Sequence, residues 1–363
     1  HDELLPERKT YVDWGDHTST RTGIGLTGIE VMDTLWLTGQ YDEFYKVIEY
    51  LKKRHTFDVS VEVSLFETTI RVLGGLLSCY ELSGEEICLT KAHDLGERLF
   101  ATFGTEGSGT VLPKASVDLK SRHAVNPGWL GNSQSLSEVT TIQLEFKKLS
   151  YFTGISKYDD AAQRVMKAVF KHLHRLRGGL YSMFVNRRDG TPDEGKVTLG
   201  ARGDSFYEYI VKQWLKEAYE VVSNGVVDHL LVQSADDEAF IAEATSMSSL
   251  DKEFKMDHLV CFAVGMFQLG KHGETKERDE KVAKDVGRIC RKMYDIHPTK
   301  LGPEIVRFRG KDHEMYASPG AHHYILRPEA LEAMFYNARY FPEEYEYWQD
   351  KGWAMFEAME KHC

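Results

Sequence analysis

At 363 residues the chain is long enough for one large domain or two ordinary ones, and with 42% hydrophobic and 28% charged residues it has a globular composition. The net charge of -11, without a long basic block, argues against nucleic acids and acidic membrane surfaces as partners. The chain has no apolar run of about 18 residues, so no membrane-spanning segment is expected in it.

The cysteines and the common ligand-binding patterns indicate little by themselves. Five cysteines are too few for a disulfide scaffold. Cys261 and Cys290 lie on consecutive predicted helices, where one bridge could form, whereas Cys79, Cys88 and Cys363 show no obvious partner. No CxxC or HExxH pattern indicates zinc, and no Walker A or Rossmann glycine pattern indicates a nucleotide. The start of the chain lacks the layout of a signal peptide.

Apolar residues recur at steps of three and four along most of the chain, which predicts a mainly helical protein. Residues 1–27 are polar and are expected to be irregular. Glycines mark predicted helix ends at Gly39, Gly84, Gly154 and Gly270. The predicted helices are 29–38, 41–54, 61–83, 86–103, 133–153, 156–174, 204–221, 225–243, 253–269, 275–295, 328–340 and 343–361.

Two further stretches are predicted not to be helical. Residues 104–131 are rich in Gly, Ser and Pro, which favours a long loop. Residues 180–199 show an alternating pattern followed by Asp189-Gly190, which is typical of a β-hairpin. Loops of this length inside a compact domain are more often functional than idle.

The predicted helix 61–83 carries Glu67 and Arg71 within an apolar pattern. The two residues are four apart, so they share one face of the helix. A carboxylate on a largely buried helix is costly unless it is paired or used. An isolated pair of this kind is most often a structural ion pair, so it does not establish a function alone. The apolar pattern consists of Leu65, Phe66, Ile70, Leu73, Leu76, Leu77 and Tyr80.

Acidic residues mark the start of every second predicted helix. They are Glu67, Glu138, Asp204, Asp257 (followed by His258) and Glu329. This spacing predicts a repeat of helical hairpins. If the hairpins close into a toroid, the inner helices point the same way and their acids gather at one mouth, beside helix N-termini that favour carboxylates. With arginines between them, the acids would suit acid–base chemistry on a neutral substrate. The alternative, that each acid only caps its helix, stays open, most of all for Glu138.

Several longer segments extend this pattern. They are VMDTLWLTGQYDEF with Asp33, VSLFETTIRVLGGLLS with Glu67 and Arg71, SEVTTIQLEF with Glu138, VTLGARGDSFYEYIVKQWL with Arg202 and Asp204, MDHLVCF with His258 and Cys261, and YILRPEALEAMFY with Arg327 and Glu329. In this order they resemble the class I α-1,2-mannosidases, glycoside hydrolase family 47. The resemblance covers residues 2–340 and implies an all-α fold, an (αα)7 barrel of helical hairpins with a β-hairpin that plugs one end.

The resemblance also implies a role for each matching residue. Glu67 matches the general acid, and Asp204 and Glu329 match the acids near the attacking water, with Glu329 the favoured base. Cys261 and Cys290 match the family disulfide. Residues that match the sugar pocket are Arg71, Glu138, Arg202, His258 and Arg327. The family inverts configuration, which requires an acid and a base far enough apart to admit a water. Family members use Ca²⁺ to hold mannose hydroxyls and the nucleophilic water.

The sequence departs from the family pattern at its two ends. The Thr-Glu pair that supplies the calcium-binding Thr is missing, as is the preceding motif, so no metal ligand can be assigned. We therefore expect a single catalytic barrel domain over residues 1–363 that lacks the family's first helix and last hairpin and is in that sense truncated and incomplete. Calcium binding and turnover by this chain are open on these grounds.

The expected function is that of an inverting exo-α-1,2-mannosidase that trims terminal α-1,2-linked mannose from high-mannose N-glycans. The alternative is a catalytically inactive, lectin-like relative that binds mannose in glycoprotein quality control. Either would work in the lumen of the endoplasmic reticulum or Golgi, an oxidising compartment that suits the Cys261–Cys290 pair. Its partners would be high-mannose oligosaccharides on glycoproteins, and a monomer is expected.

Overall fold

The computed structural model describes residues 3–5, 10–12, 23–104, 109–234 and 238–363. The chain forms two compact units. The first comprises residues 1–134, 138–170 and 186–191, and the second comprises residues 135–137, 171–185 and 192–363. Each unit has its own core of helices, and the expectation of a single domain stays a prediction.

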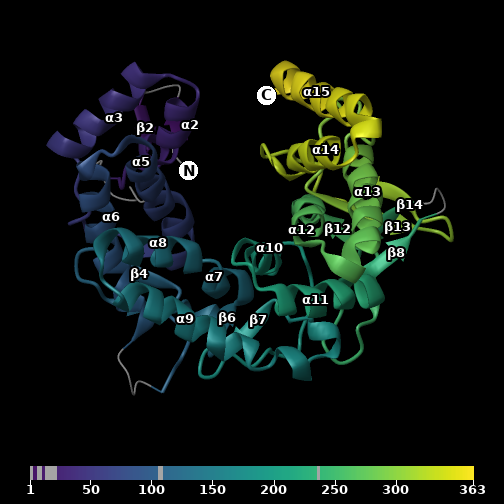
Figure 1. The fold of residues 1–363 in the computed structure, drawn as a ribbon, viewed down its shortest axis with the longest axis horizontal. Coiled ribbons are helices and arrows are strands. Elements are labelled where there is room, and N and C mark those ends of the chain that lie inside the picture. The colour runs from purple at the N-terminus through teal and green to yellow at the C-terminus, as the bar shows by residue number, and fades with distance from the viewer. Residues whose placement is uncertain (1–2, 6–9, 13–22, 105–108, 235–237) are drawn as a thin grey trace. The chain divides into compact units, whose positions relative to one another are not determined.

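Most of the chain is helical, and consecutive helices joined by short turns pack against each other (Figure 1). The first unit pairs α2 (Met32–Leu37) with α3 (Tyr41–Lys53), α5 (Gly74–Ser83) with α6 (Glu86–Leu99), and α8 (Gln143–Thr153) with α9 (Lys157–Phe170). The second pairs α10 (Asp204–Lys212) with α11 (Lys216–Gly225), α12 (Ala263–Gly270) with α13 (Lys276–Met293), and α14 (Glu329–Tyr340) with α15 (Tyr345–His362). Shorter helices are α1 (Leu26–Glu30), α4 (Leu65–Glu67) and α7 (Leu136–Thr140). The predicted helical hairpins are therefore present.

The helix ends follow local chemistry. Gly84 and Gly154 end α5 and α8 in the left-handed conformation, with φ of 73° and 71°, which a residue without a Cβ adopts at little cost. Gly39 does the same between α2 and α3, with φ of 75°. Gly270 differs from its prediction in detail, because it is the last residue of α12 and does not follow it.

The predicted helix 225–243 is wrong. After a π-helical turn at Val226–Leu230, the chain forms strands β8 (Leu231–Gln233) and β9 (Ala239–Ile241), which pair antiparallel, and then β10 (Glu243–Ala244). The segment is a short apolar run, and periodicity alone does not separate a buried strand from a buried helix in such a run. Residues 235–237 lie outside the described residues.

Small antiparallel sheets join the helical hairpins. β3 (Glu62–Ser64), β4 (Ser116–Asp118) and β5 (Ala124–Val125) form a three-stranded sheet, so residues 104–131 are not a loop throughout. A second three-stranded sheet contains β12 (Lys255–Asp257), β13 (Ile305–Arg309) and β14 (Glu314–Ala317). β10 pairs with β11 (Lys252–Glu253), and β1 (Glu3–Leu5) pairs with β2 (Thr10–Val12) inside the stretch expected to be irregular. The remaining strands are β6 (Ser133–Ser135) and β7 (Phe184–Asn186).

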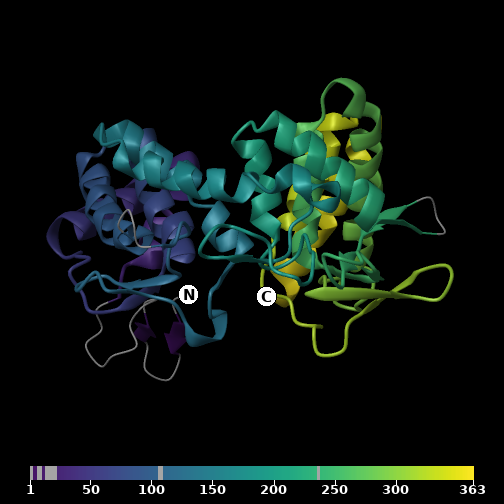
Figure 2. The same ribbon diagram turned by 90° about the horizontal axis from the view of Figure 1, so that it is seen from below.

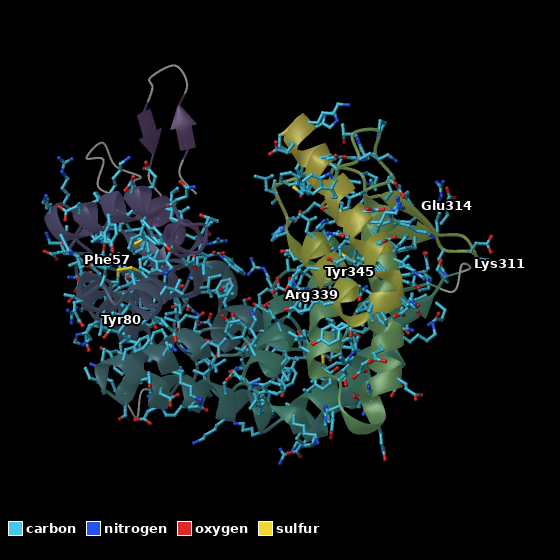
Figure 3. The ribbon with its side chains drawn as sticks, turned by 45° about the horizontal axis from the view of Figure 1, so that its top comes forward. Phe57, Tyr80, Lys311, Glu314, Arg339 and Tyr345 are labelled. Carbon is cyan, nitrogen blue, oxygen red and sulfur yellow. A yellow bond between two sulfur atoms is a disulfide. The ribbon has the colours of Figure 1, made fainter. Side chains whose placement is uncertain are left out.

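The hairpin of β13 and β14 projects from the second unit (Figures 1 and 2). Lys311 and Glu314 lie at its outer end (Figure 3). The predicted hairpin at 180–199 is present in a shorter form. Val185 bridges to Pro192, and Gly190 takes a φ of 77° in the turn between them.

Disulfide bonds join neighbouring helical segments in both units. Cys261, in the 3-10 turn before α12, is bonded to Cys290 of α13, which confirms the pair implied by the resemblance. Cys79 of α5 is bonded to Cys88 of α6. The expectation that Cys79 and Cys88 have no partner is therefore wrong, because the turn after Gly84 returns α6 alongside α5 and brings the two sulfurs together. Cys363 is free and exposed.

The core of each unit is built from the apolar faces of these helices. In the first unit Leu65, Leu73, Leu76 and Leu77 of the predicted pattern are buried. Their companions Phe66, Ile70 and Tyr80 are half-buried. Phe57 is fully buried among the helices of the same unit (Figure 3). No helix in the described part of the chain combines the length and apolarity that crossing a bilayer requires.

Candidate active site

The acidic residues singled out in the sequence lie in the first turns of helices. Glu67 ends the short α4, Glu138 lies in α7, and Asp204 and Glu329 are the first residues of α10 and α14. Asp257 directly precedes the 3-10 turn His258–Phe262. Each acid is thus beside helix N–H groups whose partial positive charge favours a carboxylate.

In the first unit, Glu67 and Arg71 form the ion pair that their spacing predicts. The Arg71 Nε donates to Glu67 Oε2 at 2.8 Å, and its Nη1 donates to Glu30 Oε1 at 2.8 Å. Burial disfavours the guanidinium, but the carboxylates of Glu67 and Glu30 outweigh it and raise the pKa of Arg71. Arg71 is held between two acids, and the Glu67 side chain stays 38% exposed, within reach of a ligand.

The backbone around this pair is unusual. The Ser64 hydroxyl caps α4 by accepting from the Glu67 N–H at 3.3 Å. The next residues, Thr68–Leu73, form a π-helical turn before the α-helix resumes at Gly74. Single π-turns inside helices are rare and occur frequently at functional sites. This turn carries Arg71, so it helps to set the direction in which the guanidinium leaves the helix.

In the second unit, His258 and Glu329 face each other. Their closest atoms, Nδ1 and Oε2, are 3.5 Å apart, and among the described residues both atoms are buried without a hydrogen-bond partner. The other ring nitrogen, Nε2, lies 3.0 Å from the Tyr294 hydroxyl. His258 is fully buried and is fixed by Tyr294, whereas Glu329 keeps 17% of its side chain exposed. A buried carboxylate oxygen without a partner is a natural acceptor for a water or a ligand hydroxyl.

Asp204 lies in the electrostatic field of Glu329. Burial raises the pKa of its carboxyl to about 6, and the charges of Glu208 and Glu329 act in the same direction. Hydrogen bonds from the Ser137 hydroxyl, at 2.8 Å, and from the Ser205 N–H, at 2.8 Å, partly oppose the increase. Buried acids that interact with each other are typical of sites that move protons.

Arg327 completes this cluster in the second unit. Its guanidinium donates to both carboxylate oxygens of Glu304, which outweighs its burial and, with Glu329 and Asp204, raises its pKa. The Tyr324 hydroxyl donates to the Arg327 carbonyl at 3.2 Å. Asp204, Arg327 and Glu329 therefore interact as one group, together with His258.

Arg202 comes from a tight turn just before α10. Its φ is 73°, which is uncommon for a residue with a side chain, and its guanidinium lies 5.6 Å from the centre of the Phe184 ring. The Arg202 carbonyl accepts from the Ser137 N–H at 3.0 Å. The turn is crowded, because a Cβ on Gly203 would lie 2.1 Å from the Thr198 carbonyl oxygen.

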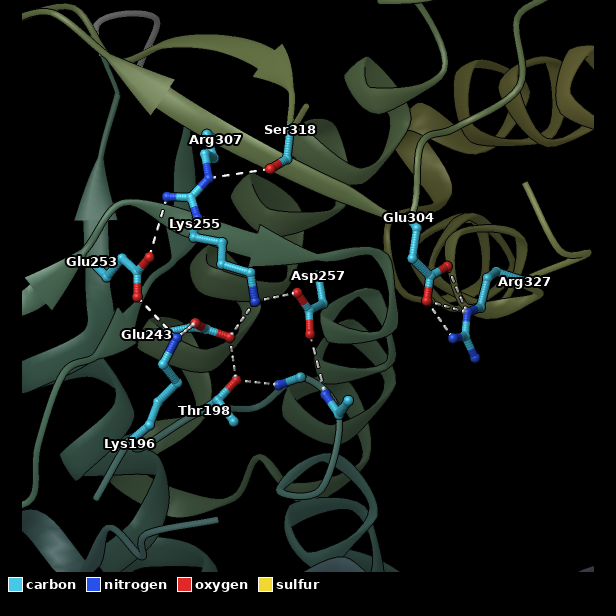
Figure 4. A network of polar contacts seen from close by, with 12 residues as sticks. Lys196, Thr198, Glu243, Glu253, Lys255, Asp257, Glu304, Arg307, Ser318 and Arg327 are labelled. Carbon is cyan, nitrogen blue, oxygen red and sulfur yellow. Dashed lines mark hydrogen bonds and ion pairs between the residues drawn. The ribbon is translucent and has the colours of Figure 1, made fainter. Parts of the chain in front are cut away.

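Side chains of a buried network of charged residues form hydrogen bonds with this turn (Figure 4). Glu243 Oε1 accepts from the Thr198 hydroxyl and from Lys255 Nζ, each at 2.9 Å. Thr198 Oγ1 in turn accepts from the Gly200 N–H at 2.7 Å. Asp257 Oδ2 accepts from the Ala201 N–H at 3.3 Å. Thr198 and the Ala201 N–H of the turn are thus hydrogen-bonded to side chains of β10 and β12.

The charges of this network are paired. Burial disfavours the Lys255 ammonium most, but Asp257 and Glu243 together outweigh it and raise its pKa. Lys196 Nζ bridges Glu243 and Glu253 at 2.7 and 2.9 Å. Arg307 contacts Glu253 at 3.2 Å. These ion pairs and hydrogen bonds hold the side chains of the network in place.

The remaining predicted residues lie in the first unit. Glu138 is half-buried in α7. Asp33 of α2 accepts from the Ser78 hydroxyl at 3.2 Å, which ties it to α5. The structure thus groups Glu67 with Arg71 in the first unit and Asp204, His258, Arg327 and Glu329 in the second.

Sequence reasoning missed Tyr294, Glu304, Tyr324 and Ser137. Tyr294 and Ser137 position predicted residues through contacts that are distant in the sequence, so no local pattern reveals them. For Glu304 the only signal was an acid in a Gly-Pro-Glu segment outside any helix, which is weak.

A calcium ion has no evident protein cage in this part of the molecule. Among the described residues, no group of three or more His, Cys, Asp or Glu side chains is arranged to hold a metal ion. Ca²⁺ prefers six to eight oxygen ligands, which the clusters above do not supply by themselves. The side chains present do not fit a protein-held metal, and the chemistry below is derived without one.

The chain is similar in sequence to known proteins along its whole length. Residues 1–363 match the sequence profile described as glycosyl hydrolase family 47. The chain is 37% identical over 380 residues to the endoplasmic reticulum mannosyl-oligosaccharide 1,2-alpha-mannosidase of Mus musculus, covering 100% of this chain and 55% of that protein. It is 36% identical over 380 residues to mannosyl-oligosaccharide 1,2-alpha-mannosidase IB of Mus musculus, covering 100% and 57%. The chain spans about half the length of these curated relatives.

Among solved structures, the chain is similar to the alpha-1,2-mannosidase from Trichoderma reesei. The TM-score is 0.79 at 24% sequence identity, and the match covers 95% of this chain and 78% of that chain. This likeness shows the fold and confirms the predicted fold class, a helical-hairpin barrel, here with small antiparallel sheets.

Proposed function

The chain belongs to glycosyl hydrolase family 47, and on that premise we propose that this protein is an inverting exo-α-1,2-mannosidase that trims terminal mannose from high-mannose N-glycans. Two relatives are named mannosyl-oligosaccharide 1,2-alpha-mannosidases, which supports the linkage and the substrate class. The observation that carries the proposal is a buried oxygen of Glu329 that has no hydrogen-bond partner among the described residues and lies 3.5 Å from His258 Nδ1, with its charge acting on Asp204.

In the proposed reaction, Glu329 acts as the base. Its free oxygen accepts a proton from a water, and the oxygen of that water bonds to C1 of the terminal mannose. The bond between C1 and the bridging oxygen breaks as that oxygen takes a proton, directly or through a water, from the general acid, a role that the family resemblance assigns to Glu67. Inversion follows because the water adds on the face opposite the leaving group.

The other residues bind and orient in this proposal. His258, fixed by Tyr294, and Asp204 hold the water at Glu329. The family resemblance assigns contacts with sugar hydroxyls to Arg71, Glu138, Arg202 and Arg327, and guanidinium and carboxylate groups together offer donors and acceptors. Mannose is neutral, so paired charges such as Arg327 with Glu304 suit it better than an isolated charge.

We infer that Ca²⁺ assists the protein, as the family resemblance implies, and that the protein works in the lumen of the endoplasmic reticulum or Golgi. When bound, calcium would orient mannose hydroxyls. The described side chains do not form a cage for it, so no step above depends on it. The compartment is supported by the names of the relatives and by two disulfides, which form in oxidising compartments.

The test is mannose release from α-1,2-linked mannobiose by wild type and by Glu329→Gln. An amide cannot take the proton of water, so we expect kcat to fall by roughly 10²–10⁴-fold with the melting temperature unchanged. The control is Glu314→Gln, which changes an exposed acid paired with Arg309 on the β13–β14 hairpin.

The first anomer formed, followed by NMR, tests inversion separately. β-Mannose is expected, and α-mannose as first product would contradict inversion. Full turnover by Glu329→Gln would remove Glu329 from the mechanism. Binding of the glycan by wild type without any release would support the lectin-like alternative.

A further inference from the structure

Two adjoining cavities open on the second unit, away from the candidate active site. The first, of about 180 Å³, is lined mainly by apolar side chains that include Trp214, Tyr219 and Leu269. The second, of about 510 Å³, is lined by polar side chains. Lys216 and His272 line both, so the two cavities adjoin, and together they are called the Trp214 groove.

Trp214 is presented to solvent by a constrained backbone. Its side chain is 83% exposed, and its φ is 55°, a conformation that costs energy for a residue with a large side chain. The turn is held by hydrogen bonds from the Trp214 N–H to Val211 and from the Lys216 N–H to Trp214. A fixed, exposed indole beside a hollow is suited to receive a flat apolar surface, because its face carries negative potential toward polarised C–H groups.

The polar half of the groove offers donors and acceptors together. Its side chains include Lys216, Glu220, Asn224, Glu274 and Arg278. Glu220 Oε1 lies 2.6 Å from His272 Nε2, whereas Lys216 Nζ is 3.9 Å from the same oxygen and is only weakly paired. Two acids and two basic side chains balance each other, which favours a neutral, hydroxyl-rich ligand over an ion.

The groove lies at the far end of the helices that carry the candidate site. α10 begins at Asp204 and ends at Lys212, two residues before Trp214. α12 follows the turn that carries His258 and ends at Gly270, which lines the groove. At 1.5 Å per residue, the eight steps of α10 from Asp204 to Lys212 span about 12 Å, and Trp214 lies beyond the end of that helix. A ligand in the groove therefore does not touch the reacting atoms.

We propose that the Trp214 groove is a second saccharide-binding site, in which one pyranose ring stacks on Trp214 and the next places its hydroxyls against the polar half. That the saccharide is a mannose-containing glycan rests on the proposed function. Such a site would hold one part of a branched glycan, or a neighbouring glycan on the same glycoprotein, while the protein acts elsewhere.

The test uses the protein with ¹⁵N-labelled tryptophan indoles and a high-mannose oligosaccharide as the probe. Glycan addition should shift the Trp214 indole signal, assigned through its loss in Trp214→Phe. In the Glu329→Gln background, Trp214→Ala should weaken glycan binding at this site by about tenfold. Trp214→Phe keeps an aromatic face and should retain most of the affinity, which separates lost stacking from misfolding.

The matched control is Trp353→Ala, which removes a 61% exposed indole from α15. It should leave the Trp214 shift intact. Equal glycan affinity in Trp214→Ala and Trp353→Ala, or no shift of the Trp214 indole at saturating glycan, would overturn the proposal. If glycan shifts the Trp214 indole signal of a wild type that releases no mannose, the saccharide site is supported and the proposed mannosidase function is rejected. Failure of one proposal can therefore be told from failure of the other.

Discussion

At the scale of one residue, the buried carboxyl of Asp204 suits proton transfer at the candidate site but lowers the stability of the folded protein at neutral pH. Its carboxyl has a pKa of about 6, chiefly because of burial, against an ordinary value of 3.8. Between these values the folded protein binds a proton that the unfolded chain has released. The free energy of unfolding therefore falls as the pH rises through this range, by about 3 kcal/mol in all for this group.

The first prediction concerns Asp204→Asn. The amide cannot ionise, so the variant should be more stable than wild type at pH 7 and should lose this part of the pH dependence between about pH 4 and 6. Urea unfolding at several pH values measures it, with the exposed Asp350→Asn as control. Parallel stability curves for Asp204→Asn and wild type would show that burial does not raise the pKa of Asp204.

At the same scale, Nδ1 of His258 and Oε2 of Glu329 indicate a place where a water or a ligand hydroxyl can bind. Both facing atoms are buried, and neither has a hydrogen-bond partner among the described residues. Leaving such groups unpaired costs about 1–3 kcal/mol each, so the fold retains them at a cost. A water or a substrate hydroxyl between them would remove that cost, which is why the Glu329→Gln test is informative.

At the scale of elements, the turn between Thr198 and Asp204 connects the buried charge network to the candidate site (Figure 4). Glu243 accepts a hydrogen bond from Thr198 and Asp257 accepts one from the Ala201 N–H, and Arg202 and Asp204 follow directly in the chain. A displacement of this turn should therefore disturb chemistry even when the rest of α10 is intact.

The second prediction tests that connection with Gly203→Ala. The new methyl would meet the Thr198 carbonyl oxygen at 2.1 Å, so the backbone must shift next to Asp204. We expect a loss of about 1–3 kcal/mol in the free energy of unfolding and a larger fractional fall in kcat than in binding. Gly128→Ala is the control, because nothing lies within 4 Å of its added methyl. A Gly203→Ala variant with wild-type melting temperature and kcat would contradict the positioning role of the turn.

The third prediction compares the two disulfides. Cys261–Cys290 closes a sequence separation of 29 residues and Cys79–Cys88 one of 9. Chain-entropy arguments give about 3–4 kcal/mol for the first and about 2–3 kcal/mol for the second. Cys261→Ser should therefore lower the melting temperature more than Cys79→Ser. If Cys79→Ser lowers the melting temperature more than Cys261→Ser, or if neither variant changes it, the length of the closed loop does not determine how much each disulfide contributes to stability.

At the scale of the whole molecule, the chain spans about half the length of its curated relatives. The fourth prediction follows from the proposed calcium cofactor. EDTA should lower the rate of mannose release, and added Ca²⁺, unlike Mg²⁺, should restore it, because the larger ion accepts more oxygen ligands in flexible geometry. Release that is insensitive to EDTA would reject calcium as the cofactor.

Much of the helical architecture could be predicted, because helix periodicity is local. The predicted helices 204–221 and 328–340 have Asp204 and Glu329 in their first turns, as in the structure, whereas the predicted helix 61–83 begins only at Leu65 because Glu62–Ser64 form β3. The segment 225–243 could not be predicted in this way. Its strands depend on hydrogen bonds to other segments, which a short apolar run does not specify.

The identity of the candidate residues was a property of the sequence alone. The order of acids, arginines and His258 along the chain indicated the family before any contact was known, and the match over residues 1–363 agrees. The Glu67–Arg71 pair was also accessible, since residues four apart on a helix are neighbours.

Only the tertiary structure decided which groups act on one another. The raised pKa of Asp204, the contact of His258 with Glu329 and the Arg327–Glu304 pair all join residues far apart in the chain. Burial and Coulomb forces depend on distance in space, which packing sets and sequence spacing does not. For the same reason Cys79–Cys88 and the Trp214 groove became visible only when helices returned alongside each other.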